Sequence, residues 1–342
     1  MPDWLVEHLL KGVSYRTRQA EYEPGAAQFD CFDVDPAATR RAYVDVFADR
    51  SEKLERERCF LADLEPVGVV ADIPALAVRA AGELGIPCVG VANFTWDWIL
   101  EPIFEGEDRS EIVDRLRDDY ARGDLHLKLP FGSPVSPFPK SESAPLVGRT
   151  PRLTVEETLG RLGIPFRDRD DRPLVLVCAG GWGANEWPAI RVSGNDHRYL
   201  FVGDLKVKTD TDAWSISDNL PAGLDFPDIV QSVDAVMTKP GYGVISECLL
   251  AGTPLVSVAR QGFRETAPML DELRDVAPHS HVSREDFFAG RWIDAVNRAL
   301  ESNIPWTDIP KDGARQVARR IGLHFGRELE PSTSDRLGET FQ

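Results

Sequence analysis

Two apolar runs in the first half of the chain flank a segment with a helical pattern. Residues 66–72 form a short apolar run that ends in an acid, and residues 88–92 form a second run. Between them, apolar residues recur at helical spacing over 75–84, which predicts a helix. This order of strand, helix and strand predicts a βαβ unit with parallel strands, whose ligands gather beyond the carboxyl ends of the strands.

The second half of the chain repeats this alternation of strand and helix patterns. Short apolar runs alternate with helical patterns there, which predicts a second parallel sheet. The predicted strands cover 173–179, 199–202, 234–238 and 254–258, and the predicted helices cover 242–251, 292–300 and 313–326.

A stretch rich in proline and serine separates the two patterns. Residues 132–151 (GSPVSPFPKSESAPLVGRTP) lack any periodicity and have the composition of a linker. We therefore predict an N-terminal domain over residues 1–140, a linker over 141–152 and a C-terminal domain over 153–327. The polar tail, 328–342, is expected to fray.

Composition and charge limit the classes of function. A length of 342 residues suits two α/β domains, and no apolar run approaches the ~20 residues that cross a bilayer. The opening sequence MPDWLVEHLLKG lacks the features of a secretory signal, so a cytoplasmic location is expected. A net charge of −17 argues against nucleic acid or an anionic membrane surface as a partner, because both need a basic face.

The five cysteines are scattered and show no spacing suited to zinc. We expect no metal site and interpret the cysteines as buried structural thiols. They are Cys31, Cys59, Cys88, Cys178 and Cys248.

One predicted strand meets the following helix through a turn with two glycines, Gly241 and Gly243, on either side of Tyr242 and shortly after Lys239. Glycine permits close approach of the backbone to a ligand, and the amides and dipole of a helix N-terminus favour a diphosphate. Glu247 lies about one helical turn further on, where a carboxylate can accept both hydroxyls of a ribose. The alternative is an ordinary strand-to-helix turn followed by a solvated glutamate.

The surrounding sequence resembles the donor half of GT-B glycosyltransferases. The resemblance is strongest to the glycosyltransferase family 28-like group, which includes MurG-like enzymes and the glycosyltransferase-like domain found beside sugar kinases. The matching run is FPDIVQSVDAVMTKPGYGVISECLLAGTPLVSVARQGFRE, from Phe226 to Glu265, followed by AGRW at 289–292 and DGA at 312–314. The resemblance implies an α/β fold of two Rossmann-like domains that face each other across a cleft.

The same resemblance implies further donor contacts in the C-terminal half. Arg260, Phe263 and Glu265 would lie near the donor sugar or the cleft, and a solvated loop is the alternative. The glycine turn after the first strand of this half occupies the place of a loop that faces the cleft in similar enzymes. Its residues are Gly180, Gly181 and Gly183.

In the N-terminal half, residues 71–99 (ADIPALAVRAAGELGIPCVGVANFTWDWI) resemble the same group. Asp72 occupies a strand end where many related enzymes keep an aspartate that orients a catalytic histidine and raises its basicity. Asn93, Trp96 and Asp97 follow the next strand and are expected on the acceptor side of the cleft. A buried turn rich in tryptophan is the alternative for these three residues.

The chain departs from the group at its start. Related chains begin with an apolar strand, a GHGxGHxxR-like loop and a helix, and only then reach the equivalent of residues 2–6. We therefore expect the N-terminal domain to lack its first strand and helix. None of the six histidines stands in a comparable motif, so the usual catalytic pair is not evident in this sequence.

The predicted function is that of a metal-independent glycosyltransferase of the hexosyltransferase type. It would move a sugar from a nucleoside diphosphate sugar, expected to be a UDP-sugar, to an acceptor hydroxyl. The nucleotide sugar is a co-substrate, and no cofactor is expected. The alternatives are a remnant that binds nucleotide sugars without turnover and a nucleotide-sugar epimerase of the same fold. The pattern specifies neither the acceptor nor an oligomeric state.

Overall fold

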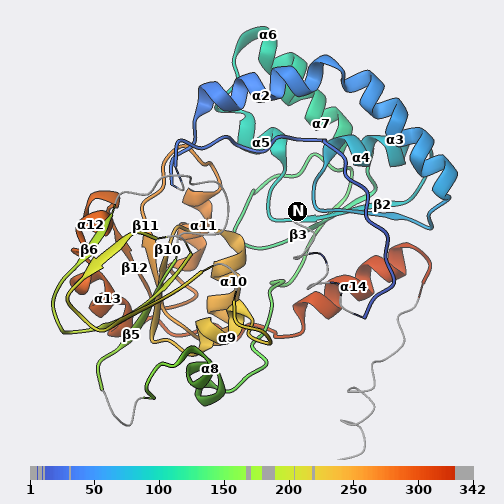
Figure 1. The fold of residues 1–342 in the computed structure, drawn as a ribbon. Helices are drawn as coiled ribbons and strands as arrows, with labels where there is room; N and C mark the ends of the chain where they lie inside the picture. Colours follow the sequence, from blue (N-terminus) through green and yellow to red (C-terminus); the bar gives the residue numbers. More distant parts are fainter. Residues whose placement is uncertain are drawn as a thin grey trace, which may run out of the picture.

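The computed structural model shows two α/β units, each built on its own parallel sheet (Figure 1). The residues that it describes are 6, 10, 12–30, 32–166, 171–178, 189–203, 205–217 and 220–327.

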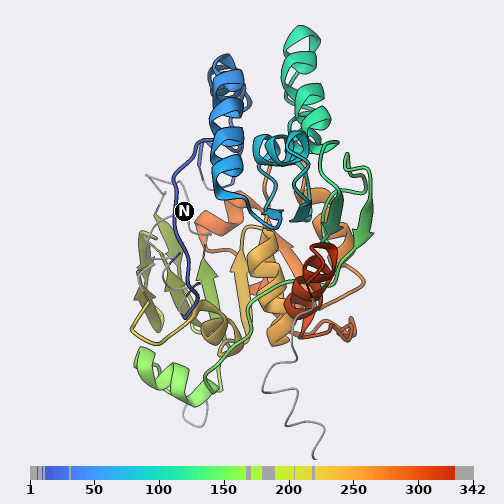
Figure 2. The same ribbon diagram turned by 90° about the vertical axis from the view of Figure 1, so that its right-hand side faces the viewer.

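The N-terminal sheet has four parallel strands in the order β1-β2-β3-β4 within the described residues. They are β1 (Val69–Ala71), β2 (Cys88–Ala92), β3 (Leu125–Lys128) and β4 (Ser141–Ser143). Figure 2 shows the helices above this sheet as two separate columns. One column contains α2 and α3, and the other contains α6 and α7. The helical elements are α2 (Pro36–Ala48), α3 (Arg50–Leu64), α4 (Ala75–Glu83), α5 (Trp96–Leu100), α6 (Gly106–Asp108), the π-helical turn η1 (Arg109–Asp114) and α7 (Arg115–Tyr120).

The C-terminal sheet has six parallel strands in the order β12-β11-β10-β5-β7-β9. They are β5 (Leu174–Cys178), β7 (Arg198–Val202), β9 (Ala213–Ile216), β10 (Ala235–Thr238), β11 (Leu255–Val258) and β12 (His279–Val282). A separate pair joins β6 (Ile190–Val192) to β8 (Val207–Thr209). The helices are α8 (Val155–Leu162), α9 (Phe226–Gln231), α10 (Tyr242–Ala251), α11 (Thr266–Leu273), α12 (Arg284–Ala289), α13 (Ile293–Leu300) and α14 (Gly313–His324).

The strands and helices predicted from the apolar pattern are confirmed, with small differences at their ends. The central strands β5, β7, β10 and β11 are buried along their whole length, because helices cover both faces of the sheet. This is why each of them stands out in the sequence as an uninterrupted apolar run.

The pattern did not reveal the two long helices α2 and α3. Helix α3 (RSEKLERERCFLADL) is charged on most of its surface, and its buried residues are only Arg50, Glu57 and Leu61. A helix with so few buried apolar residues shows almost no apolar periodicity in its sequence.

Helix α14 lies in the stretch that the sequence assigns to the C-terminal domain, yet it packs against the N-terminal sheet (Figure 1). Val317 joins Val89 of β2 and Leu125 of β3 in one apolar cluster. After the helix, the ring of Phe325 lies so close to Gly68 that a β-carbon there would approach within 2.4 Å of it. The chain therefore covers the second face of its first sheet with its last described helix.

The predicted linker overlaps the last strand of the N-terminal sheet. Residues 141–143 form β4 and pair with β3, so only the following residues cross to α8. Of the described cysteines, Cys88, Cys178 and Cys248 are buried, as expected. The prediction is wrong for Cys59, which is exposed on the polar side of α3. Within the described residues no helix has the length and apolar character needed to span a membrane.

Gly132 provides a test of how closely the backbone is packed beside the end of β2. A β-carbon on Gly132 would lie 1.8 Å from the Asn93 carbonyl oxygen. We expect Gly132→Ala to lower the free energy of unfolding by about 1–3 kcal/mol, because the backbone must shift to admit a methyl group.

The matched control is Gly160→Ala in α8, where an added β-carbon meets no described atom within 4 Å. This change should stabilise the protein by up to about 1 kcal/mol through helix propensity. Urea titrations of both variants measure the difference, and equal stabilities would contradict the close packing at residue 132.

Candidate functional site

The N-terminus of α10 is not covered by other side chains of the described residues. Gly241 is the N-cap residue in an extended conformation, with φ −159° and ψ 143°, and as a glycine it has no side chain to cap the helix. A β-carbon on Gly241 or Gly243 would meet no heavy atom of the described residues within 4 Å. The first amides of a helix have no partner within the helix, so this turn can present N–H groups to an anion. Lys239, half-buried, precedes the turn.

Tyr242 attaches the interdomain segment to this helix. Its hydroxyl oxygen accepts a hydrogen bond from the Val147 amide at 2.9 Å. Burial raises the pKa of the Tyr242 hydroxyl to about 12, so the hydroxyl stays protonated at neutral pH. The contact fixes the crossing segment beside the glycine turn.

Glu247 is 5% exposed and is paired with Arg149 of the same crossing segment. Both Nε and Nη2 of Arg149 lie 2.7 Å from Oε1 of Glu247. Burial raises the pKa of the Glu247 carboxyl, and the guanidinium opposes this shift. Nothing in the sequence indicated a role for Arg149, because this residue belongs to a Pro- and Ser-rich stretch without a pattern.

Two of the predicted residues from opposite domains meet in the cleft. Nδ2 of Asn93, at the end of β2, donates to Oε1 of Glu265 at 2.6 Å and also to the carbonyl of Phe131 at 3.1 Å. Asn93 and Glu265 are both nearly fully buried. Burial raises the pKa of the Glu265 carboxyl, and the hydrogen bond from Asn93 opposes this shift without cancelling it.

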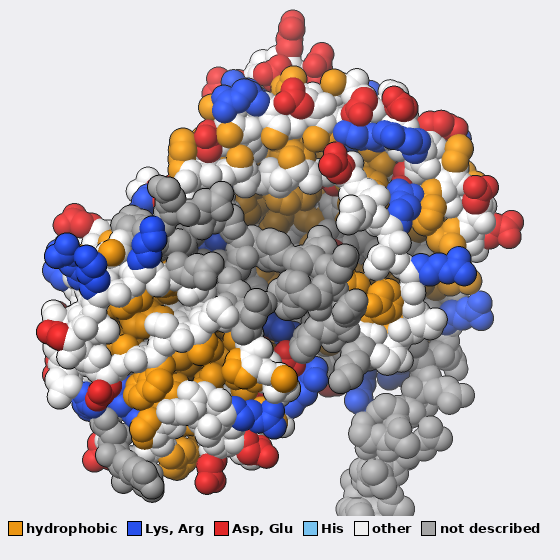
Figure 3. All heavy atoms as spheres, in the orientation of Figure 1, with side chains coloured by type: hydrophobic (Ala, Val, Ile, Leu, Met, Phe, Trp, Pro, Cys, Tyr) orange, Lys and Arg blue, Asp and Glu red, His pale blue; other side chains and the backbone are white. Residues whose placement is uncertain are grey.

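An aromatic group continues this contact. The rings of Phe94 and Phe263 meet edge to face with centroids 6.0 Å apart, and Phe94 meets Trp96 in the same way at 5.4 Å. The guanidinium of Arg260 lies over the Phe263 ring, 4.0 Å from its centroid. Phe263 thus packs with the core of the N-terminal domain although it belongs to the C-terminal one. Figure 3 shows the surface hollowed between the two units, with hydrophobic side chains inside the hollow.

Asp97 lies deeper in the N-terminal domain than its two predicted neighbours. Its side chain is buried, and Oδ2 accepts from Nε of Arg117 on α7 at 3.4 Å. Burial raises the pKa of the Asp97 carboxyl. The structure therefore joins Asp97 to α7, on the helical side of the sheet.

Asp72 follows β1 at its carboxyl end and has an exposed side chain, although desolvation by the surrounding protein raises the pKa of its carboxyl. The next residue, Ile73, has a φ of 53°, which is unusual for a β-branched residue. The Tyr120 hydroxyl donates to the Ile73 carbonyl at 2.8 Å and supports this turn. Strained backbone of this kind is concentrated at functional sites.

The predicted residues Gly180, Gly181 and Gly183 are outside the described residues. Each described histidine has a partner of its own. His126 contacts Ser136 and, next to Asn93, the Ala92 carbonyl. The other partners are Asn297 for His197, the Ala277 carbonyl for His279, Ser257 for His281 and Asp124 for His324.

The arrangement combines a helix start that can present amides to an anion, a buried carboxylate behind it and a polar contact between the domains. Lys239, Arg149 and Arg260 place cations in this region of an acidic protein, where Arg149 is paired with Glu247. Such a site suits a diphosphate ester that carries hydroxyl groups.

Comparison with known proteins bears on the fold. No protein-family model matches the chain. The chain is 28% identical over 312 residues to an L-arabinokinase of Arabidopsis thaliana, a match that covers 87% of the chain and 28% of that relative. The chain therefore spans little more than a quarter of this relative's length. It is also 23% identical over 304 residues to an uncharacterized glycosyltransferase of Methanopyrus kandleri, covering 84% of the chain and 81% of the relative.

Among solved structures, a UDP-glucosyltransferase from Polygonum tinctorium superimposes with a TM-score of 0.55 at 14% identity, over 96% of this chain and 90% of that one. The chain has the GT-B glycosyltransferase fold. The UGT2 protein of Phytolacca americana agrees, with a TM-score of 0.52 at 14% identity over 95% of this chain and 84% of that one. The GT-B arrangement accounts for two facing parallel sheets with Asn93 and Glu265 between them.

The raised pKa of Glu265 predicts a specific dependence of stability on pH. A carboxyl whose pKa is raised on folding stabilises the fold at low pH and loses that contribution as the pH rises above its ordinary value. In Glu265→Gln, the amide oxygen can still accept from Asn93 but does not ionise. We expect the melting temperature of the wild type relative to this variant to fall as the pH rises from about 4 to 8. A difference that stays constant with pH would argue against a buried, titrating Glu265.

Proposed function

We propose that this protein transfers a sugar from a nucleoside diphosphate sugar, with UDP-sugars as the expected donors, to a hydroxyl group of an acceptor. The observation that carries the proposal is the open glycine turn at the start of α10 with the buried carboxylate of Glu247 one turn behind it. The GT-B fold supports it, as do the names of the Methanopyrus relative and of the Polygonum enzyme.

The donor is assigned to the C-terminal side of the cleft. The diphosphate binds the amides at Gly241 and Gly243, where the missing β-carbons allow a close approach, and Lys239 adds a positive charge. Arg149 binds Oε1 of Glu247, and we assign the ribose hydroxyls to Oε2. The glycines at 180, 181 and 183 are proposed to supply further amides to the donor.

The sugar is assigned to the region between the domains, beside Glu265 and Arg260. Asn93 and Trp96 would contact the acceptor from the other side. In the reaction, the bond between the sugar carbon and the diphosphate oxygen breaks, and the acceptor oxygen bonds to that carbon. The acceptor proton passes to the Asp72 carboxylate, whose pKa is raised by desolvation, and the nucleoside diphosphate leaves with the electron pair of the broken bond.

Stabilisation of the leaving diphosphate is proposed to need no metal. Helix amides and cations that are already oriented can stabilise the developing charge without reorganisation. If no metal is needed, the rate of nucleotide release should be the same, within about twofold, for protein treated with EDTA and for protein supplemented with Mg²⁺. Abolition of release by EDTA, with recovery on adding Mg²⁺, would remove this part of the proposal.

A second candidate is a protein that binds nucleotide sugars without turning them over. It is favoured by the described histidines, which all bond to groups away from Asp72 and the glycine turn. Calorimetry with UDP-, GDP- and dTDP-sugars together with a nucleotide-release assay separates the two candidates. Binding with acceptor-dependent release supports transfer, and binding without release supports the second candidate. Free UDP or an altered sugar without an acceptor indicates an epimerase.

Glu247 offers a direct test of the donor site. We expect Glu247→Ala to weaken binding of UDP by about 1–3 kcal/mol, the range for hydrogen bonds to a charged group. Glu247→Gln keeps the shape of the side chain and should show an intermediate loss. Glu156→Ala, which changes an exposed glutamate on α8, is the control and should bind UDP like the wild type. Unchanged affinity in both Glu247 variants by calorimetry would remove this residue from the site.

A further inference from the structure

A short hairpin from the N-terminal part of the chain reaches across to the C-terminal domain. We call its residues, 27–30 and 32–35, the strap. The Phe29 amide donates to the Asp33 carbonyl at 3.0 Å and closes the turn. Oδ1 of Asp30 accepts from the amides two and three residues further on, at 2.8 and 3.0 Å. The strap therefore has a shape fixed by its own hydrogen bonds.

Phe32 is buried in the core of the opposite domain. Its side chain is 0% exposed and belongs to the same apolar cluster as Val177 and Met237 of the C-terminal sheet. The ring meets Phe287 and Phe288 of α12 edge to face, with centroids 5.5 and 5.9 Å apart. A fully buried aromatic ring is a strong anchor, so the strap cannot lift without exposing it.

Ion pairs flank this anchor. Arg284, on the first turn of α12, pairs with Asp30 through Nη2 and with Asp33 through Nη1. One guanidinium thus holds both acids of the strap, and all three side chains are partly shielded from solvent.

The strap also bonds to the loop at residues 259–265, which we call the donor loop. Nε of Arg260 donates to the Phe32 carbonyl at 3.2 Å. The Val34 amide donates to the Gln261 carbonyl at 3.3 Å, and the Gln261 amide donates to Oδ1 of Asp33 at 3.3 Å. These contacts fix the loop that carries Arg260, Phe263 and Glu265.

At its other end the strap is joined rigidly to the N-terminal domain. Asp35 is the N-cap of α2, and its Oδ1 accepts from the Ala38 amide at 2.8 Å. The Thr39 hydroxyl donates to the Asp35 carbonyl at 2.7 Å, and the Ala27 amide donates to the same hydroxyl oxygen at 3.0 Å. The strap therefore links α2 to the donor loop through a continuous set of hydrogen bonds.

We propose that the strap is the positioning element of the donor loop: it holds Arg260 and Glu265 at the cleft while Phe32 is seated, and it couples movement of the N-terminal domain to donor binding. The part that concerns the donor rests on the proposed function. Phe32, Asp30, Asp33 and Arg284 are positioning residues, since they act through the loop.

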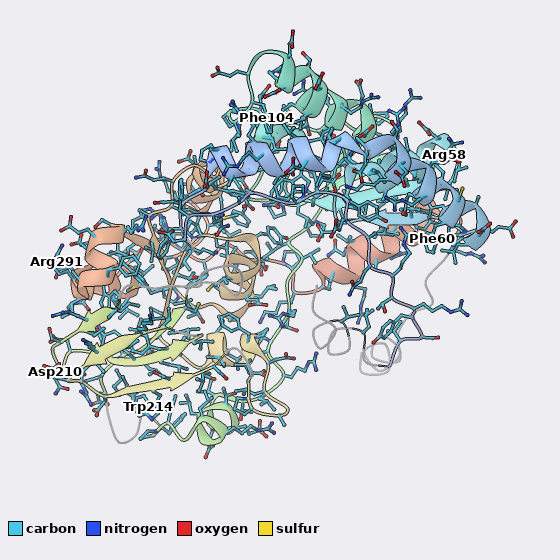
Figure 4. All side chains as sticks on the ribbon, turned by 45° about the horizontal axis from the view of Figure 1, so that its top comes forward. Arg58, Phe60, Phe104, Asp210, Trp214 and Arg291 are labelled. Atoms are coloured by element: carbon cyan, nitrogen blue, oxygen red, sulfur yellow. The ribbon has the colours of Figure 1, made fainter. Side chains whose placement is uncertain are left out.

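The test compares hydrogen exchange and kinetics in full-length variants. Arg284→Gln removes both ion pairs and leaves the aromatic anchor in place. The matched control is Arg291→Gln, at the other end of α12, where Arg291 pairs with Glu285 and Asp286 of the same helix. Figure 4 shows Arg291 at the outer edge of the C-terminal domain.

In the ligand-free protein, Arg284→Gln is expected to raise amide exchange in residues 259–265 about tenfold, the scale of one lost charge-assisted contact. Exchange in β10 and β11 should not change, and Arg291→Gln should match the wild type throughout. With a UDP-sugar that the wild type turns over, Arg284→Gln should raise KM severalfold and leave kcat within about twofold. Arg284→Lys should restore part of the loss, because a lysine keeps one of the two ion pairs.

Unchanged exchange in the donor loop, or an equal rise across the whole chain, would overturn the proposal. A local rise in exchange without a change in KM would also overturn it, because the strap would then be a structural contact alone. If the wild type releases no nucleotide from any sugar donor, the proposed transfer fails, and calorimetric Kd for UDP replaces KM as the readout for the strap. Phe32→Ala and Phe32→Leu extend the series, and leucine should retain most of the exchange protection.

Discussion

The carboxylate of Glu265 is buried between the two domains, and a buried acid needs a hydrogen-bond donor. That donor is Asn93, which reaches across the cleft from the end of β2 and is itself oriented by the Phe131 carbonyl. Glu247 is also buried and also has a partner from another part of the chain. This partner is Arg149, from the segment that joins the domains. Each of these two carboxylates is thus paired with a group from outside its own sheet. The site exists only in the assembled pair of domains, and the cleft geometry is held by these contacts.

Much of the fold could be predicted from the sequence, because strands that are covered on both faces consist of continuous apolar runs. Helix α3 could not, since more than half of its residues are charged and two of its three buried residues are charged as well. In the site, the turn around Gly241 was visible as a local pattern, whereas the bond between Asn93 and Glu265 joins positions 172 residues apart. One sequence contains no signal for such a distant pair. Arg149 and Phe32 were missed for a similar reason: each is a single residue in a stretch without periodicity.

The environment of Glu247 refines the role that its position in the sequence suggests. A glutamate one turn into a helix is expected to face a ribose with both oxygens, yet one oxygen here already binds a guanidinium. Arg149 favours the charged form of the carboxylate, whereas burial, the larger effect, favours the protonated form. Through this ion pair the guanidinium also offsets the negative charge behind the glycine turn. In a chain of net charge −17, such local cations decide whether an anion can approach.

The return of α14 to the N-terminal sheet bears on how the chain reaches its folded state during synthesis. The faces of β2 and β3 that Val317 covers remain without their helix until the ribosome has made almost all of the second domain. The opposite order applies to the strap. Phe32 is synthesised early, but its ring is buried only after α12 has been made. Neither half can therefore finish its core alone. The two domains are separate in architecture, yet the core of the first is completed by α14, which the chain makes after the sheet of the second.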